Sequence, residues 1–190
     1  MIKKLNINSL IPVIMFILFF LIFLILTKGQ IATQYNLKII VEQSIPVIIG
    51  GLGMIFVISQ GSIDISQGAV LALAGTVSTI LVTKYGIGWL YPSAILVGAA
   101  CGLLSGVLVS VFKMLSIMVT LSLLIGIRGL VNHLIGSDVH FATAEMFALG
   151  DTLYLAGIIL FIIMGYLFKY TKMGYYSKAI GENETAVKCV

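Results

Sequence analysis

The chain has 190 residues, of which 60% are hydrophobic and only 9% are charged, and its formal net charge is +4. Soluble domains of this size carry about a quarter charged residues, so the composition excludes a water-soluble globule and indicates an integral membrane protein. The positive charge forms no basic cluster on a soluble domain, which argues against nucleic-acid binding and for lysine-rich cytoplasmic loops.

Six segments are apolar enough to be transmembrane helices, since a span needs about 20 mostly apolar residues. In chain order they are 9–27, 42–59, 66–83, 91–112, 116–135 and 153–170. The stretch FFLIFLILTKGQ, at the end of the first segment, offers bulky residues where a cleavage site has small ones, so the segment is a retained span rather than a cleaved signal peptide. The fifth segment is the weakest candidate because it contains Arg128. We therefore predict an all-α integral membrane protein with about six transmembrane helices and a break near residues 59–67.

The lysines predict the orientation of these spans. If the N-terminus lies in the cytoplasm, six spans place the C-terminus there too, and the cytoplasmic side then holds Lys3, Lys4, Lys113, Lys169, Lys172, Lys178 and Lys188. The opposite side holds fewer lysines together with three acids: Lys28, Lys38, Lys84, Asp138, Glu145 and Asp151. This bias agrees with the positive-inside rule, so we predict that both termini are cytoplasmic.

The stretch SQGSIDISQG, from Ser59 to Gly68, interrupts the apolar pattern between the second and third spans. Gly61 and Gly68 bracket it, and each predicts a backbone conformation that is unfavourable inside a helix. Asp64 or Ser66 is a candidate N-cap, and with Asp64 as the cap, Gln67 completes a capping box. An acid near membrane depth is also costly and points to function. For Asp64, a structural cap and an element of a substrate pathway both stay open.

Polar residues also interrupt the fifth span. Arg128 either extends its charge to the membrane interface or contacts a solute. Asn132 and His133 lie on nearly the same helical face and extend a polar seam, for which a satisfied structural cluster is the favoured interpretation. No metal site is predicted, because His133 and His140 lack ligand partners at suitable spacing.

Small residues recur every four positions in the fourth span, at Gly98, Gly102 and Gly106. This spacing lets helix backbones approach closely in lipid. Ordinary packing within one subunit is favoured over a subunit interface. Cys101 lies in the same span and Cys189 near the C-terminus, in settings too different to predict a redox pair.

After the sixth span, lysines mix with Glu182 and Glu184. The segment predicts either an amphipathic surface helix or a solvated end, with a turn at Gly181 and Asn183 before a short helix that Asn183 caps. Its place directly below the spans suits the docking of a soluble partner.

Three stretches together resemble the permeases of sugar-type ABC importers, the ribose, galactose and xylose class. The first, GGLGMIFVISQGSIDISQGAVLALAG, resembles the family pattern L-G-M-T-x-V-I-x-x-G-G-I-D-L-S-V-G-S-x-x-A-L through Gly53, Met54, Val57, Ile58, Gly61, Ile63, Asp64, Ser66, Gly68, Ala72 and Leu73. It departs from that pattern at Ser62, where the family usually has glycine, and at Gln67, where it has a small apolar residue.

The second stretch resembles G-x-x-N-G-x-x-x-x-x-x-x-x-P-x-F-I-x-T-L-x-x-x-x-x-x-R-G-L through Thr120, Leu121, Arg128, Gly129 and Leu130. Ser105, Ser116 and Met118 replace its usual asparagine, proline and isoleucine. The third resembles the cytoplasmic loop G-x-x-x-x-A-I-G-x-N-x-x-A-A-x-x-x-G-I through Gly174, Ala179, Ile180, Gly181, Asn183, Glu184 and Ala186. Each motif alone is weak, but all three occur in the family's order and spacing.

The resemblance implies a permease subunit that moves a monosaccharide or related small polar solute across the bacterial inner membrane by alternating access. Residues 1–190 would then form one transmembrane permease domain, the N-terminal part of a longer family domain, with a coupling loop over 171–190. Its implied partners are a cytoplasmic ATP-binding subunit, an extracytoplasmic solute-binding protein and a second permease copy. The chain itself would hold no cofactor, because it lacks the G-x-x-x-x-G-K-[ST] phosphate loop and ATP would be bound by the partner subunit.

The resemblance also suggests functional residues. The implied substrate pathway contains Gly61, Asp64, Ser66, Arg128 and Asn132, and the implied contact with the ATPase contains Gly174, Ala179, Gly181, Asn183, Glu184 and Ala186. No catalytic residue is expected, because Asp64 has no obvious acid–base partner for an intramembrane enzyme.

Family members are longer than this chain, so we expect either a fragment or a truncated gene product. A truncated, non-transporting remnant or assembly factor is the alternative function. A permease for nucleosides or branched-chain amino acids is another alternative, although branched-chain amino acid permeases lack the G-x-I-D-x-S stretch.

Overall fold

The computed structural model describes residues 7–136, 145–146 and 149–187. For the helical residues 7–9, 150–151, 153–154 and 183–187 only the backbone is described. The predicted positions Lys3, Lys4, Asp138, His140, Lys188 and Cys189 lie outside the described residues. The chain divides into two compact units, Met1–Pro46 and Val47–Val190, and each is described by itself.

The described residues form helices and connecting turns, which confirms the predicted all-α class. Unit 1 contains α1 (Ile7–Leu26), the short 3-10 helix η1 (Gln30–Ala32) and the start of α2 (Gln34–Ser59). Unit 2 contains the rest of α2 followed by α3 (Gln67–Tyr85), η2 (Ile87–Trp89), α4 (Leu90–Ser110), α5 (Ser116–Ile135), α7 (Gly150–Tyr170) and α8 (Lys172–Val187).

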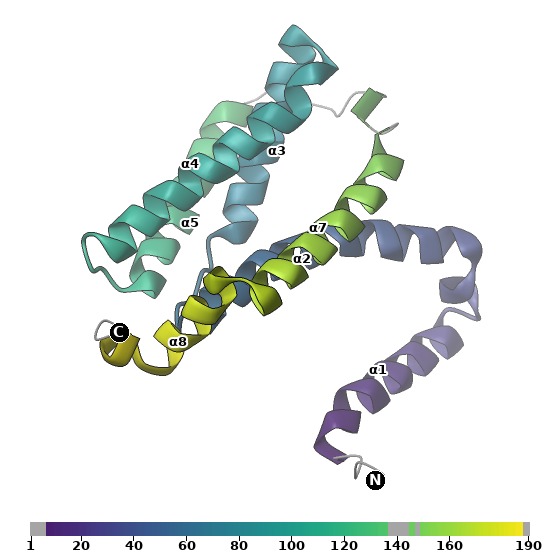
Figure 1. Ribbon diagram of the computed structural model, residues 1–190. Helices are drawn as coiled ribbons and strands as arrows, with labels where there is room; N and C mark the ends of the chain where they lie inside the picture. The colour runs from purple at the N-terminus through teal and green to yellow at the C-terminus, as the bar shows by residue number, and fades with distance from the viewer. Residues whose placement is uncertain (1–6, 137–144, 147–148, 188–190) are drawn as a thin grey trace. The chain divides into compact units, whose positions relative to one another are not determined.

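Each of the six predicted spans corresponds to a helix in Figure 1. Within the described residues, α2, α3, α4 with η2, and α5 are long and apolar enough to cross a membrane, and the bent pair α7–α8 adds a fifth candidate. Residues Leu10–Leu26 of α1 form a shorter apolar helix. The chain is therefore a multi-pass membrane protein.

Helix α2 begins at Gln34, earlier than the predicted start at residue 42. The prediction followed hydropathy, whereas the backbone stays helical through a polar stretch in which Lys38 and Glu42 form an ion pair with 3.7 Å between nitrogen and oxygen. Such a pair, one helical turn apart, supports a helix exposed to water. Along the chain, the boundary between the two compact units follows Pro46 of α2, which lacks the N–H of a regular helical hydrogen bond.

Helix α3 packs against both α4 and α5, and Figure 1 shows the three helices side by side. The core between them contains the buried side chains Ala69, Leu73, Ile127 and Val131. Cys101 of α4 is partly buried against this core. A buried polar pair joins α3 to α4, since the hydroxyls of Ser78 and Ser93 lie 2.8 Å apart. Each hydroxyl also reaches a backbone carbonyl at the start of α4, so neither is left without a partner.

The regularly spaced glycines of α4 do not make the expected contacts. For Gly98, Gly102 and Gly106, no described heavy atom lies within 4 Å of where a Cβ would stand. Gly102 and Gly106 are exposed. Among the described residues these glycines therefore make no close helix contact, and both interpretations, packing within one subunit and a subunit interface, stay predictions.

The end of the described chain is bent. Helices α7 and α8 meet at Thr171 with an angle of 63° between them. Thr171 is extended, and its hydroxyl donates back to the carbonyl of Leu167 at 2.5 Å. Helix α8 then continues without interruption through Gly181. The predicted turn at Gly181 and Asn183 is therefore wrong: Gly181 is accommodated within a helix whose packing requires a residue without a side chain, as described below.

Candidate functional site

The polar break between α2 and α3 begins with a helix stop at Gly61. The N–H of Gly61 donates to the carbonyl of Ile58 at 2.9 Å, and the N–H of Ser62 donates to that of Val57 at 3.1 Å. This pair of bonds is the Schellman motif, whose left-handed residue is usually glycine. Gly61 has φ 74°, as the motif requires. The prediction for Gly61 is confirmed, whereas Gly68 lies within the first turn of α3 and has no positive φ.

Residues 62–66 are not helical and carry Asp64 at their centre. One oxygen of the Asp64 carboxylate accepts hydrogen bonds from the Ser66 N–H at 2.8 Å and from the Ser66 hydroxyl at 2.7 Å. The bond to the N–H two residues on is an Asx turn. Asp64 is partly buried, and Ser66 is only 3% exposed.

The predicted capping box at the start of α3 does not form. The N-cap is Ser66, its side chain makes no capping bond, and Gln67 is the first helical residue rather than the third. Because the N-cap lies two residues beyond Asp64, the carboxylate bonds to Ser66 instead of to the first turn of α3. The side chain of Gln67 instead lies beside Gly50 of α2, where a Cβ would be 3.4 Å from its oxygen.

Helix α5 holds the non-helical segment through the backbone of Ile63. The Ser116 hydroxyl donates to the Ile63 carbonyl at 2.6 Å and accepts from the Ile63 N–H at 3.2 Å. The hydroxyl of Thr120, one turn further, lies 3.4 Å from the same carbonyl. Backbone groups outside a helix need such partners in a membrane. Ser116 stands where the resembling family usually has proline, which offers no hydroxyl.

Helix α8 contacts the chain at the end of α2, where the break begins. The Gln60 side chain donates to the hydroxyl of Ser177 at 3.3 Å, and Ser177 is only 2% exposed. A Cβ placed on Gly181 would overlap the backbone carbonyl of Ser59. The two backbones therefore touch at a point where only glycine fits.

A second backbone contact joins α8 to the end of α7. A Cβ on the buried Gly174 would overlap the carbonyl of Phe168. The Phe168 ring in turn meets the ring of Phe56 on α2 edge to face, with centroids 5.2 Å apart. Lys178 of α8 places its ammonium 4.4 Å from the centre of the Phe168 ring. The ends of α2 and α7 and the start of α8 thus form one packed cluster.

The residues predicted to contact an ATPase fall into two sets. Gly174 and Gly181 face α7 and α2, as the contacts above require, and Ala179 is partly buried. Asn183, Glu184 and Ala186 lie in the last turns of α8, where the side chains are outside the described residues.

The residues predicted to line the substrate pathway also fall into two separate groups. Gly61, Asp64 and Ser66 lie together at the break, whereas Arg128 and Asn132 are exposed on α5, one turn apart. Arg128 is twelve residues beyond Ser116, roughly 18 Å along the helix. Among the described residues the only ion pair is Lys38–Glu42, so Arg128 does not neutralise Asp64. His133 is exposed as well.

Sequence reasoning missed four residues that build this site: Gln60, Ser116, Thr120 and Ser177. Ser116 carried a signal, since it departs from the family's usual proline. The bond between Gln60 and Ser177 joins positions 117 residues apart and left no local pattern. We call the whole arrangement of Ser59–Ser66 with Ser116, Thr120 and Ser177 the break site.

Comparison with known proteins matches residues 36–190 to a family described as the permease component of branched-chain amino acid transport systems. The galactofuranose transporter permease protein of Escherichia coli is 31% identical over 158 residues, which cover 78% of this chain and 46% of that protein. The ribose import permease protein of Haemophilus influenzae is 33% identical over 167 residues, which cover 80% of this chain and 51% of that protein. The fructose import permease protein of Bifidobacterium longum is 28% identical over 206 residues, covering 97% and 58%.

No solved structure matches the chain. The chain spans about half the length of the first two of these relatives. The relatives are sugar permeases, which confirms the resemblance drawn from the break, the Thr120–Leu130 stretch and the tail. The family match covers most of the chain and includes every helix of the break site. The chain therefore belongs to the family of transport-system permease components, alongside the permeases of sugar importers.

Proposed function

We propose that the chain is a permease subunit of an ATP-binding cassette importer that carries a monosaccharide or a related small polar solute across the bacterial inner membrane. Its relatives are named for galactofuranose, ribose and fructose, which supports a sugar-like solute. The observation that carries the proposal is the packing of α8 against the end of α2, next to the Asp64 segment.

In this proposal a cytoplasmic ATP-binding subunit docks on α8 and supplies the motion. The contact between Gly181 and the Ser59 carbonyl contains no side chain that bends or rotates. A shift of α8 would therefore be passed directly to the end of α2. The Gly61 turn joins that end to residues 62–66, so the position of the Asp64 carboxylate would follow the position of α8.

The remaining partners are those that the resemblance to importer permeases implies. The α8 side of the membrane is cytoplasmic, both termini lie on that side, and a solute-binding protein delivers the solute from the opposite side. A second permease copy completes the pathway. The chain performs no chemistry and holds no cofactor, since ATP is bound by the partner subunit. Gly61, Asp64 and Ser66 contribute one part of the pathway, and Arg128 and Asn132 contribute another.

Affinity purification from native membranes tests the docking step. We expect the tagged chain to recover a protein that carries a G-x-x-x-x-G-K-[ST] phosphate loop. Glu182→Lys reverses an exposed charge on α8 and should reduce this recovery, whereas Glu145→Lys, at an exposed position far from α8 in the sequence, serves as the matched control. Equal recovery with both variants, or recovery of the chain alone, would contradict the proposal.

Solute uptake tests the role of Asp64. Asparagine keeps an oxygen that accepts the two bonds from Ser66 but removes the charge. We expect Asp64→Asn to lower uptake about tenfold, the effect of about 1.4 kcal/mol, in cells that carry the complete importer. Glu145→Gln should leave uptake unchanged. Similar uptake by the two variants would show that Asp64 is a structural residue only.

A further inference from the structure

One face of α7 carries an unbroken exposed stripe. Leu155, Ile159, Ile162 and Tyr166 follow one another at helical spacing, and all four are exposed. Leu155 is 64% exposed and Ile162 is 63% exposed. In a membrane protein, an apolar stripe of this kind contacts lipid chains, because water would make its exposure costly.

The stripe ends in tyrosine and lysine. The rings of Tyr166 and Tyr170 lie with centroids 5.4 Å apart, and the Lys169 ammonium lies 5.1 Å from the centre of the Tyr170 ring. Tyrosine is enriched where lipid chains give way to headgroups, and lysine near a helix end extends its ammonium toward that level. Along this face, α7 therefore passes from the level of the lipid acyl chains to the level of the headgroups at Lys169.

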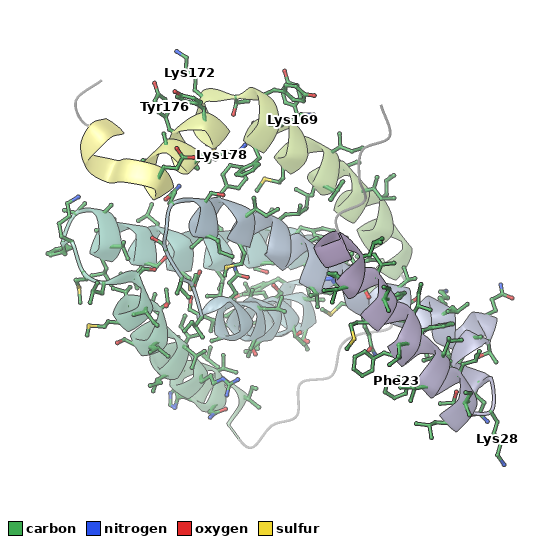
Figure 2. The ribbon with its side chains drawn as sticks, turned by 90° about the horizontal axis from the view of Figure 1, so that it is seen from below. Phe23, Lys28, Lys169, Lys172, Tyr176 and Lys178 are labelled. Carbon is green, nitrogen blue, oxygen red and sulfur yellow. The ribbon has the colours of Figure 1, made fainter. Side chains whose placement is uncertain are left out.

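The bend at Thr171 keeps the next residues at a similar level. Because α8 leaves α7 at 63°, its first turns run partly along the membrane surface rather than straight away from it. Lys172, Tyr175 and Tyr176 are exposed there, with the two tyrosine rings 5.9 Å apart. Figure 2 shows Lys169, Lys172 and Tyr176 on the outer side of this bend. An aromatic and basic helix surface of this type is typical of interfacial helices.

The charge of this region has one sign. Between Thr152 and Gly181 the sequence contains Lys169, Lys172 and Lys178 but no aspartate or glutamate. Lys178 lies over the Phe168 ring and Lys169 over the Tyr170 ring, and Figure 2 shows Lys169 and Lys172 on the outer side of the bend. In the part of the chain that the structure describes, neither of these two lysines forms an ion pair. A surface with this charge attracts anions.

We propose that the α7–α8 corner, formed by Tyr166, Lys169, Tyr170, Lys172 and Tyr175, binds the phosphate groups of anionic phospholipids. The ammonium groups of Lys169 and Lys172 contact the phosphate, and the tyrosine rings lie beside the glycerol and upper chain region. Lipid fits better than a soluble protein because the apolar stripe of α7 runs continuously into the corner. The bound lipids hold the bend between α7 and α8 at the membrane surface, and this role does not depend on transport.

Lipid retention by the purified full chain tests the proposal. We expect native mass spectrometry from mixed micelles to show that the chain retains phosphatidylglycerol in preference to phosphatidylcholine. Each lysine near an anionic surface strengthens the attraction to it, so Lys169→Gln with Lys172→Gln should lower the preference roughly tenfold or more. The preference of the unaltered chain should also fall as the salt concentration rises.

Two matched variants make the result specific. Lys84 lies 5.3 Å from the centre of the Tyr85 ring, a similar lysine–tyrosine pair at the end of α3 with no second lysine beside it. Lys84→Gln should leave the preference unchanged, and Lys169→Arg with Lys172→Arg should retain it. Equal retention of the two lipids by the unaltered chain would overturn the proposal, and so would an equal loss in Lys84→Gln or a loss in the arginine variant.

Discussion

Helices α4 and α8 both contain glycines, but the two sets differ in what surrounds them. Beside Gly98, Gly102 and Gly106 of α4, no described atom lies within 4 Å of where a Cβ would stand. Beside Gly174 and Gly181 of α8, a Cβ would overlap a backbone carbonyl. The regular four-residue spacing of α4 is the stronger sequence signal, yet the less regular set makes the close contacts.

This difference shows that glycine spacing alone does not identify a helix contact. A small residue permits a close approach, but a partner backbone has to be present to use it. In α8 the partners are the last turns of α2 and α7, which the bend at Thr171 brings within reach. The glycines of α8 therefore constrain the position of a helix, whereas those of α4 leave a surface open.

The largest effect is expected from a methyl group at Gly181. Gly181→Ala forces the Ser59 carbonyl and α8 apart, and overpacking of this kind costs about 1–3 kcal/mol. Gly174→Ala, against the Phe168 carbonyl, should act in the same direction. Unfolding of the purified chain in micelles by increasing amounts of sodium dodecyl sulfate measures the change.

Gly102→Ala is the control for this prediction. Its methyl group enters open space in the interior of α4, where replacing glycine by alanine stabilises a helix by about 0.5–1 kcal/mol. The two substitutions should therefore have opposite signs. The same sign for both would remove the distinction between the two helices.

Position 61 sharpens the comparison, because it requires glycine for a left-handed backbone conformation and not for a close contact. No described atom lies within 4 Å of a Cβ at this position, yet φ is 74°. Left-handed backbone costs an L-residue about 1–2 kcal/mol, so Gly61→Ala should lower stability by about that amount. Gly61→Asn should cost less, since asparagine tolerates this conformation. Detergent unfolding measures both, and an equal loss in the two variants would contradict the backbone explanation.

Ser116 extends the same reasoning from glycines to hydroxyls within one helix. The Ser116 hydroxyl bonds both the N–H and the carbonyl of Ile63, whereas the Ser122 hydroxyl bonds only the Met118 carbonyl of its own helix. Ser116→Ala removes both bonds to Ile63 and should cost about 1–2 kcal/mol.

Ser122→Ala should change stability by less than about 0.5 kcal/mol, because the carbonyl it leaves is already part of the helix. Both variants are measured by the same detergent unfolding. An equal loss of stability in Ser122→Ala and Ser116→Ala would mean that the bonds to Ile63 do not account for the effect of Ser116→Ala.

The helices could be predicted from the sequence because hydropathy alone determines where a chain enters lipid. Each of the six predicted segments coincides with a helix, and α5 forms an unbroken helix despite Arg128. Helix ends that fall in polar sequence were less predictable, because hydropathy does not determine them. Helix α2 begins at Gln34, in a polar stretch, and helix α8 continues past Gly181.

The break site was predictable only in part. The position of Asp64 between two apolar runs indicated a break, and Gly61 indicated its first turn. The residues that bond to the break come from α5 and α8, which are distant in the chain. Local spacing therefore could not predict the bonds made by Ser116 and Ser177. The predicted capping box is wrong because α3 begins at Gln67 with Ser66 as its N-cap, two residues later than a cap at Asp64 requires.

The smallest expected effect concerns the bond between Gln60 and Ser177, the one side-chain link between α2 and α8 among the described hydrogen bonds. At 3.3 Å it is long, and Ser177 also donates to the carbonyl of Met173 in its own helix. A double-mutant cycle of Gln60→Ala and Ser177→Ala should therefore give a coupling energy of about 0.5 kcal/mol. Detergent unfolding of the four proteins measures it. If the coupling exceeded the cost of Gly181→Ala, the side-chain bond would hold α8 in place, and the backbone contact at glycine would be secondary.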